Sequence, residues 1–297
     1  MTRGISLDDA TRQGGPRGDQ PAPSEGEDSG RAVARRSPRP RKRAPAGSPA
    51  LYVAWPAESP PSSPAPEDGR VALVSGGNRG LGLQVVRMLA ERGMRVVLGS
   101  RSVESGRDAI ESLGDLADRV AVRQLDITNP DSVAALTSWM DRRLGRCDVL
   151  VNNAAVLLDD DDIDATAVDL DVVVSTLNTN LLGTWRLTQA VVPLMRACGY
   201  GRIVNMSSDG DGVPPPGRGL PAYRLSKAAV NTLTRMLAAE LADDGILVNA
   251  CTPERAGILT GRAVPPTPLA SAAVWLATLP DGGPTGGFFR GFSAVER

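Results

Sequence analysis

The chain has 297 residues, of which 41% are apolar, with 33 basic and 34 acidic side chains and no histidine. This length allows one large domain or two ordinary ones with a real core, and the near-zero net charge gives no general argument for binding nucleic acid or membrane. The absence of histidine excludes Ser-His-Asp and Cys-His catalysis and histidine-based metal sites. Proton transfer must therefore use Tyr, Lys, a carboxylate, Cys or water, and we predict no metal site.

Residues 1–69 differ in kind from the rest of the chain. They hold 12 of the 24 prolines and show no apolar periodicity, so we predict a disordered Pro/Arg-rich extension. Within it, residues 31–43 carry seven basic side chains in thirteen. Such an arm can bind nucleic acid, but it lacks interleaved aromatic residues and is flanked by acidic stretches. We therefore favour a solvated tail or a misassigned start, with no nucleic-acid partner.

From Arg70 onward, apolar β-branched runs alternate with stretches of helical periodicity. Strands are predicted at 71–74, 95–98, 120–123, 149–151, 203–206 and 246–249, with a last one around 287–289. Helices are predicted near 80–92, 103–117, 130–145, 168–198, 222–243 and 268–279. Because several strands are apolar throughout, the alternation predicts a parallel sheet covered on both faces. Residues 70–297 should thus form a single doubly wound α/β domain, the Rossmann fold.

The first predicted strand leads directly into a glycine-rich turn, Ser75-Gly-Gly-Asn-Arg-Gly-Leu-Gly82, and then into a helix. Glycines at 76, 80 and 82 permit a tight turn, close approach of the backbone to a pyrophosphate, and close packing of the helix on the strand. The phosphates would lie at the helix N-terminus. This strand-turn-helix context predicts a dinucleotide site.

The second predicted strand indicates which dinucleotide is bound. In an NAD site, a carboxylate about 20 residues beyond the glycines binds the ribose hydroxyls. That carboxylate is missing here, and Arg101 stands at the strand end while Arg79 lies inside the glycine turn. Two guanidinium groups can converge on a 2′-phosphate dianion. The sequence therefore predicts NADP(H) over NAD(H).

A phenol and an amine, Tyr223 and Lys227, stand four residues apart at the front of a long amphipathic pattern. Residues at this spacing share one helix face, so both can address a single bound molecule. Lys227 is one of only two lysines in an arginine-rich chain, and it supplies a compact ammonium group with a tunable pKa. Taken alone, this spacing more often marks a solvated helix surface.

Three widely spaced cysteines, Cys147, Cys198 and Cys251, lie in apolar surroundings and predict reduced structural thiols in a cytoplasmic protein. No run approaches the ~20 apolar residues needed to cross a bilayer, so we predict no membrane partner. The pair Arg35-Arg36 lacks the apolar region of an export signal.

Over about residues 70–290 the chain resembles the short-chain dehydrogenase/reductases, and more narrowly their carbonyl-reductase-like subgroup. The resemblance rests on the glycine turn, Asn152-Asn-Ala-Ala155, the Tyr-x-x-x-Lys pair and their order. It implies a catalytic tetrad of Asn180, Ser208, Tyr223 and Lys227, with Ser207 a less favoured alternative to Ser208. It also implies the following cofactor contacts: Gly76, Asn78, Arg79, Gly80, Leu81, Gly82, Arg101, Asp126, Ile127, Asn153, Ala154, Tyr223, Lys227 and Pro253.

The resemblance implies NADPH-dependent reduction of a ketone or aldehyde substrate. A carbonyl reduction needs a hydride from the cofactor and a proton from a positioned acid, and Tyr223 is the best acid available. Lys227 would stabilise the phenolate, Ser208 would hold the substrate oxygen, and Asn180 would orient a relay water. Relatives pair their long helices, so a homodimer or homotetramer is expected.

Departures from the family pattern leave an alternative open. After the sixth strand, the family's Pro-Gly followed by Thr is replaced by Pro253-Glu-Arg-Ala-Gly-Ile-Leu-Thr260. The alternative is a catalytically weak NADP(H)-binding regulatory protein with an altered nicotinamide loop. Residues 209–220 are predicted to form the opposite wall of the substrate site. The acidic run 159–162 is predicted to be four solvated carboxylates ahead of a helix.

Overall fold

The structure is a computed structural model that describes residues 69–208, 219–252 and 266–295. The predicted extension up to residue 68, most of the predicted wall at 209–220, and the altered segment from Pro253 to Thr260 lie outside these residues.

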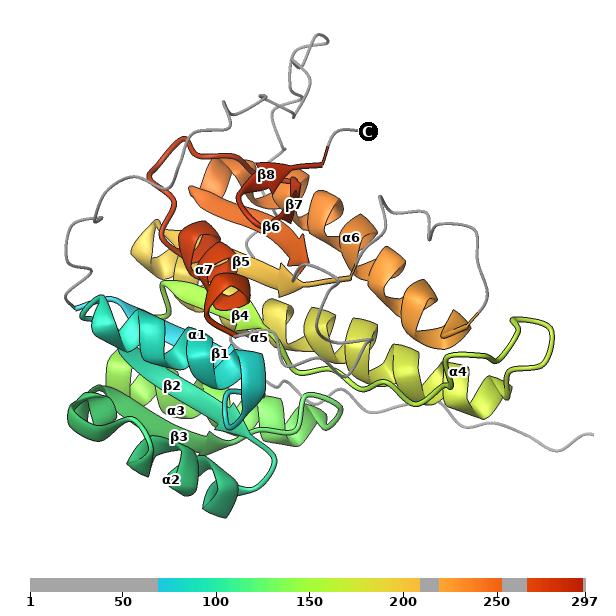
Figure 1. Cartoon of the computed structure of the whole chain (residues 1–297). Coiled ribbons are helices and arrows are strands. Elements are labelled where there is room, and N and C mark those ends of the chain that lie inside the picture. Colours follow the sequence, from blue (N-terminus) through green and yellow to red (C-terminus); the bar gives the residue numbers. More distant parts are fainter. Residues whose placement is uncertain (1–68, 209–218, 253–265, 296–297) are drawn as a thin grey trace, which may run out of the picture. The chain divides into compact units, whose positions relative to one another are not determined.

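A mostly parallel sheet forms the centre of the described part (Figure 1). Its strand order is β3-β2-β1-β4-β5-β6-β7-β8, with every pairing parallel except the last, between β7 and β8. The strands are β1 (Val71–Ser75), β2 (Arg95–Ser100), β3 (Val120–Gln124), β4 (Val149–Asn152), β5 (Gly201–Met206), β6 (Ile246–Thr252), β7 (Phe288–Arg290) and β8 (Ser293–Ala294). The predicted doubly wound α/β fold is confirmed, and the order on each side of β1 is that of dinucleotide-binding sheets.

Helices cover both faces of this sheet. They are α1 (Gly80–Glu91), α2 (Val103–Glu111), α3 (Pro130–Leu144), α4 (Leu170–Leu177), α5 (Thr184–Cys198), α6 (Pro221–Leu241) and α7 (Pro266–Ala277). On one face, a core that includes Val85 of α1 and Val274 of α7 packs against the strands. On the other, Leu136 of α3, Leu187 of α5 and Leu233 of α6 form a second core.

Two predicted helices differ from the observed ones, each for a local reason. The helix predicted over 103–117 ends at Glu111, and a 3-10 turn over Gly114–Arg119 begins at Gly114, whose φ of 60° is left-handed. The helix predicted over 168–198 contains a π-helical turn, η2 (Asn178–Gly183), between α4 and α5. Strand β8 was not predicted, because a strand of two residues is too short to show an alternating pattern. It follows Gly291, whose φ of 60° is left-handed.

A buried polar network fixes the middle strands against the helices on one face. Asn152 of β4 donates from Nδ2 to Oδ1 of Asn205 in β5 (2.8 Å) and to Thr188 in α5 (3.1 Å). Asn205 in turn donates to Oγ1 of Thr234 in α6 (2.8 Å). Buried hydrogen-bond networks of this kind favour one arrangement of the elements, here the one that sets α6 beside β5.

Candidate active site at the carboxyl ends of the strands

The glycine turn joins β1 to α1 through positions that need glycine, either for a positive φ or for lack of space. Gly76 and Gly80 have φ values of 64° and 53°, a backbone region that favours glycine. A Cβ at Gly82 would collide with the carbonyl oxygen of Gly76 and lie 2.5 Å from Nδ2 of Asn153. The turn therefore forms a cradle of bare backbone, which is what a closely approaching pyrophosphate requires.

The two residues that follow β4 form hydrogen bonds to this turn. The Ser75 hydroxyl oxygen accepts hydrogen bonds from the backbone N–H groups of Asn153 (3.0 Å) and Ala154 (3.1 Å). Nδ2 of Asn153 donates to the carbonyl oxygens of Ser75 (2.9 Å) and Gly76 (3.0 Å). Asn153 and Ala154, which directly follow β4, thus support the cradle through the Ser75 hydroxyl and the backbone of the turn.

The start of α1 suits an anionic group. Its first turn carries no acidic side chain, and the N-cap residue Arg79 forms no side-chain cap. Arg79 and Gly80 are exposed, while Leu81 packs against the core and Asn78 donates to Oγ of Ser105 in α2 (3.2 Å). The positive end of the helix dipole faces the turn, so the residues present fit the pyrophosphate of a dinucleotide.

The ends of β2 and β3 place a cation beside an acid. Arg101 is exposed directly after β2, and Asp126 follows β3. Hydrogen bonds from Thr128 and the nearby Arg101 and Arg186 hold the pKa of the Asp126 carboxyl below its ordinary value. Ile127 is buried against η2, where a Cβ at Gly183 would lie 2.8 Å from its side chain. This part of the site therefore holds the Asp126 carboxylate, which interacts electrostatically with Arg101.

Tyr223 and Lys227 share one face of α6, as their spacing predicts. Lys227 is only 6% exposed, and its Nζ lies 5.5 Å from the centroid of the Tyr223 ring. The ammonium donates to the carbonyl oxygen of Met206, at the end of β5 (2.8 Å). Burial lowers the pKa of Lys227 to about 8. A cation with this pKa beside a phenol is a group that can stabilise a phenolate near neutral pH.

The two candidate serines after β5 have different surroundings. Ser207 is buried, with Oγ donating to the carbonyl oxygen of Lys227 (3.4 Å) and its N–H donating to Cys251 (2.8 Å). Ser208 is half-buried and comes one residue further toward the carboxyl edge. The hydroxyl of Ser207 is thus turned to the backbone of α6.

Asn180 lies in the π-helical turn η2 and is 1% exposed. Its Oδ1 accepts from the Val156 N–H (2.8 Å), and its Nδ2 donates to Val156 O (2.9 Å) and to Oγ of Ser226 (3.0 Å). Ser226 Oγ donates to the carbonyl oxygen of Tyr223 (2.7 Å). Asn180 is therefore joined to the tyrosine through Ser226, which sequence reasoning missed. π-turns are often found at functional sites.

Asp159 corrects one sequence expectation. It was predicted as part of a solvated run, but it is buried, while Asp160, Asp161 and Asp162 are exposed. Its Oδ2 accepts from the backbone N–H groups of Ala222 (2.6 Å) and Tyr223 (3.3 Å). The signal for this contact is the start of α6 itself, because Leu220-Pro221 offers no side chain that can cap a helix.

Other predicted features lie elsewhere or were not described. Pro253 is outside the described residues. The three cysteines are free thiols, and burial raises the pKa of Cys251 to about 12. In the part of the chain that the structure describes, no group of side chains suits a metal ion. Among the helices of that part, none has the length and apolar character to span a membrane.

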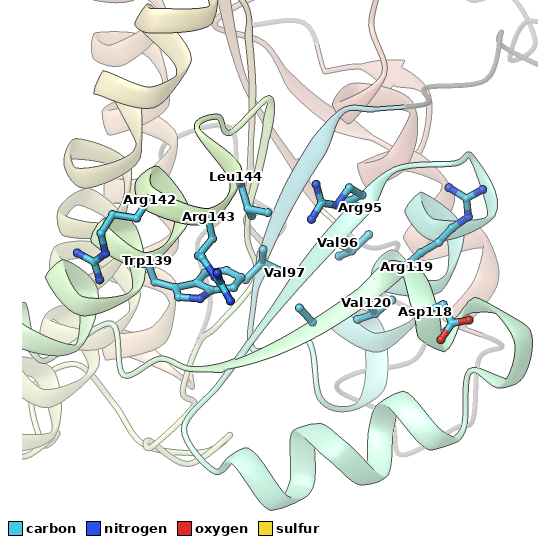
Figure 2. A pocket seen from close by; sticks show the side chains of 11 residues that line it. Arg95, Val96, Val97, Asp118, Arg119, Val120, Trp139, Arg142, Arg143 and Leu144 are labelled. Atoms are coloured by element: carbon cyan, nitrogen blue, oxygen red, sulfur yellow. The ribbon is translucent and has the colours of Figure 1, made fainter.

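A hollow of about 460 Å³ lies away from these residues, at the amino ends of β2 and β3 (Figure 2). It is lined by Trp139 and Arg143 of α3 and by Arg95 of β2, among others. Sheets of this topology bind their ligands at the carboxyl ends of the strands. The hollow is therefore separate from the candidate active site.

Fold and site together define a dinucleotide-binding protein of the Rossmann class. Comparison with known proteins gives the family: the family model described as "short chain dehydrogenase" matches residues 70–261. The chain therefore belongs to the short-chain dehydrogenase family, as its motifs predicted.

Among its relatives, "Oxidoreductase UcpA" of Escherichia coli (strain K12) is 39% identical over 186 residues, which is 62% of this chain and 68% of the relative. The "3-oxoacyl-[acyl-carrier-protein] reductase FabG" of Vibrio cholerae is 33% identical over 230 residues, 71% of this chain and 91% of the relative. A solved structure, a metagenomic short-chain oxidoreductase in complex with NADP, has a TM-score of 0.66 and 30% identity, covering 77% of this chain and 99% of its own. The chain is thus an oxidoreductase of this family.

Proposed function

We propose that the protein reduces a ketone or aldehyde to an alcohol with NADPH, in the manner of carbonyl reductases. The observation that carries the proposal is the buried ammonium of Lys227, 5.5 Å from the Tyr223 ring centroid at the carboxyl edge of the sheet. A relative that acts on a 3-oxoacyl group supports a ketone as the substrate class. The substrate itself stays open.

In the proposed mechanism, the nicotinamide cofactor supplies a hydride when it is bound. Ser208 donates a hydrogen bond to the substrate oxygen and holds it beside Tyr223. Tyr223 donates its phenolic proton to the oxygen as negative charge develops there. Lys227 stabilises the resulting phenolate, and the proton is restored from solvent through a water that Asn180 positions.

The choice of NADP(H) rests on charge at the neighbouring ends of β1 and β2. Arg79 and Arg101 are both exposed there, and the strand end that would hold an acid in an NAD site reads Gly99-Ser100-Arg101. The solved relative in complex with NADP supports this choice. Arg79→Ala or Arg101→Ala should each lower kcat/KM for NADPH about tenfold and leave NADH unaffected. A wild-type preference for NADH would contradict the proposal.

Tyr223→Phe tests the proposed mechanism. It removes the proton donor and keeps the ring, so kcat should fall by about three orders of magnitude or more while the Kd for NADPH stays unchanged. Tyr200→Phe is the matched control, because Tyr200 lies just before the amino end of β5. Wild-type turnover in Tyr223→Phe would refute the assignment. NADPH binding by the wild type without turnover of any ketone or aldehyde would favour the catalytically weak alternative.

We also propose that copies of the chain associate through α4 and α6. These helices expose large apolar side chains, Leu170 and Val174 on α4 and Leu225 and Met236 on α6. Exposed apolar groups gathered on neighbouring helices are typical of protein interfaces. Light scattering on the purified protein should give a dimer or tetramer, and Val174→Glu should shift it toward the monomer.

A further inference from the structure

The first turn of α6 carries Tyr223 and depends on a distant residue for its hydrogen bonds. Pro221 has no N–H to satisfy, and the Arg224 N–H donates to Leu220 O (2.9 Å). The N–H groups of the two residues between Pro221 and Arg224, Ala222 and Tyr223, both donate to Oδ2 of Asp159. Leu220 forms no side-chain cap. The carboxylate therefore completes the helix start from 63 residues upstream.

The neighbours of Asp159 hold the approach to this helix as well. Leu220 N–H donates to Asp160 O (3.1 Å), and a Cβ at Gly219 would collide with Asp161 O. Leu220 has a φ of 54°, the left-handed region that a bulky side chain rarely adopts. The segment 159–161 thus fixes an unusual backbone conformation immediately before Tyr223.

A second set of contacts closes a ring around the tyrosine. Ser226 Oγ holds the carbonyl oxygen of Tyr223 and accepts from Asn180, whose side chain holds both backbone polar groups of Val156. Val156 precedes Asp159 by three residues. The ring therefore runs from Asp159 through Tyr223, Ser226 and Asn180 back to Val156. It fixes the peptide groups on both sides of Tyr223.

We propose that Asp159 is a positioning residue for Tyr223, because its carboxylate sets the first turn of α6 and its negative charge offsets the positive helix end beside the phenol. The inference rests on the proposed role of Tyr223. Asp159 is 6% exposed, and its Oδ1 is buried with no partner among the described residues. A carboxylate in this position costs free energy unless the helix end compensates it, so charge and hydrogen bonds act together.

Other charged side chains come from α6 and from the elements that pack against it, within the described part of the chain. Lys227 and Arg224 come from α6, with Lys227 itself close to Cys251 of β6. Asp171 lies in the first turn of α4, which packs on α6, and Asp160, Asp161 and Asp162 are exposed. Of the acids named here, Asp159 is the one bonded to the first turn of α6. Its replacement is therefore expected to change the potential at the phenol most.

Three variants test the proposal: Asp159→Ala, Asp159→Asn and, as a matched control, Asp162→Asn at an exposed position. Asp159→Ala should speed hydrogen exchange at the Ala222 and Tyr223 amides about tenfold or more and lower kcat about 10- to 100-fold. The Kd for NADPH should stay within about twofold, because the cofactor cradle is built elsewhere. Asp162→Asn should leave all three quantities unchanged.

Asp159→Asn separates charge from hydrogen bonding. The amide keeps an acceptor oxygen, so the two backbone amides should stay protected from exchange. Without the negative charge, the helix end stabilises the phenolate, and Tyr223 should titrate at lower pH than in the wild type. Phenolate absorbance measured as wild type minus Tyr223→Phe, and likewise in the Asp159→Asn background, isolates this residue from Tyr52 and Tyr200.

Unchanged exchange in Asp159→Ala, or an unshifted phenol titration in Asp159→Asn, would overturn the positioning role. Exchange and titration need no substrate. If Tyr223→Phe keeps full turnover, the proposed function fails, while these two measurements still decide what Asp159 does.

Discussion

Two buried cations lie at opposite ends of the same strand and have different surroundings. Arg202, at the amino end of β5, is 1% exposed and donates to the carbonyl oxygens of Leu279 (2.8 Å), Gly201 (2.9 Å) and Gly245 (3.3 Å). It also pairs with Asp281 (2.7 Å) and stacks on the Tyr200 ring at 4.0 Å. Each nitrogen of this guanidinium has an acceptor within the protein, and the Tyr200 ring stacks on it.

Lys227 of α6, whose ammonium lies at the carboxyl end of β5, is also buried and has fewer partners among the described residues. Its ammonium has three donor hydrogens. Among the described residues it donates to one acceptor, Met206 O. No carboxylate contributes to its lowered pKa. We therefore expect Arg202 to serve the fold, and we expect Lys227, which has one acceptor among the described residues and lies beside a phenol, to serve the proposed reaction.

Lys227→Met is the sharpest test of this difference. Removing the ammonium should lower kcat about a thousandfold, because the phenolate loses its nearest positive charge. The melting temperature should change little, since the lost hydrogen bond to Met206 O is offset by removal of the cost of a desolvated cation. Steady-state kinetics and thermal unfolding on one preparation check both. Turnover of Lys227→Met within tenfold of wild type, or a large loss of its stability, would contradict the proposed difference between Lys227 and Arg202.

Arg202→Met should give the opposite result. Three carbonyl oxygens would lose their donor in a buried setting, so the free energy of unfolding should fall by about 3 kcal/mol. Turnover per folded molecule should stay near that of the wild type, because the change is at the far end of β5. Denaturant titration measures the loss.

The matched control for Arg202→Met is Arg196→Met, whose ion pair with Asp244 is partly exposed. It should cost about 1 kcal/mol or less. Equal losses in the two variants, or loss of turnover in folded Arg202→Met, would contradict a purely structural role for Arg202.

The sequence predicted those features that depend on neighbours along the chain. The glycine turn is read from eight consecutive residues, and Tyr223 and Lys227 from a spacing of four, because each requires only one strand or one helix to form. The alternation of apolar strands and helices likewise predicted the sheet and both helical layers. The local geometry of these motifs follows from backbone sterics.

The features that sequence reasoning missed depend on contacts between distant segments. Asp159 lies within a run of four acids, and nothing within that run distinguishes the one that reaches the start of α6. Arg202 is one of many arginines, and its burial depends on carbonyl groups from two distant points of the chain, Leu279 and Gly245. Contacts of this kind can be identified only once the folded structure shows which distant segments lie side by side.

The pH dependence of the reaction should report on Lys227 directly. Its pKa of about 8 means that the free protein loses this positive charge as the pH rises through that value. The phenolate is then less stabilised, Tyr223 becomes a weaker acid, and kcat/KM for the carbonyl substrate should fall about tenfold per pH unit. Lys227→Met should lack this step, so the same break in both profiles would assign it to another group.

Stability should respond to the same titration with the opposite sign. Below pH 8, Lys227 is charged in both the folded and the unfolded chain, and its burial destabilises the fold in full. Between pH 8 and about 10.4, the unfolded chain binds the proton that the folded one has lost, so the free energy of unfolding rises with pH relative to Lys227→Met. Denaturant midpoints for both proteins at pH 7 and pH 9.5 measure this gain. Because guanidinium groups are not deprotonated in proteins, the difference in stability between wild type and Arg202→Met should be constant over the same interval, which makes the two cations distinguishable by pH alone.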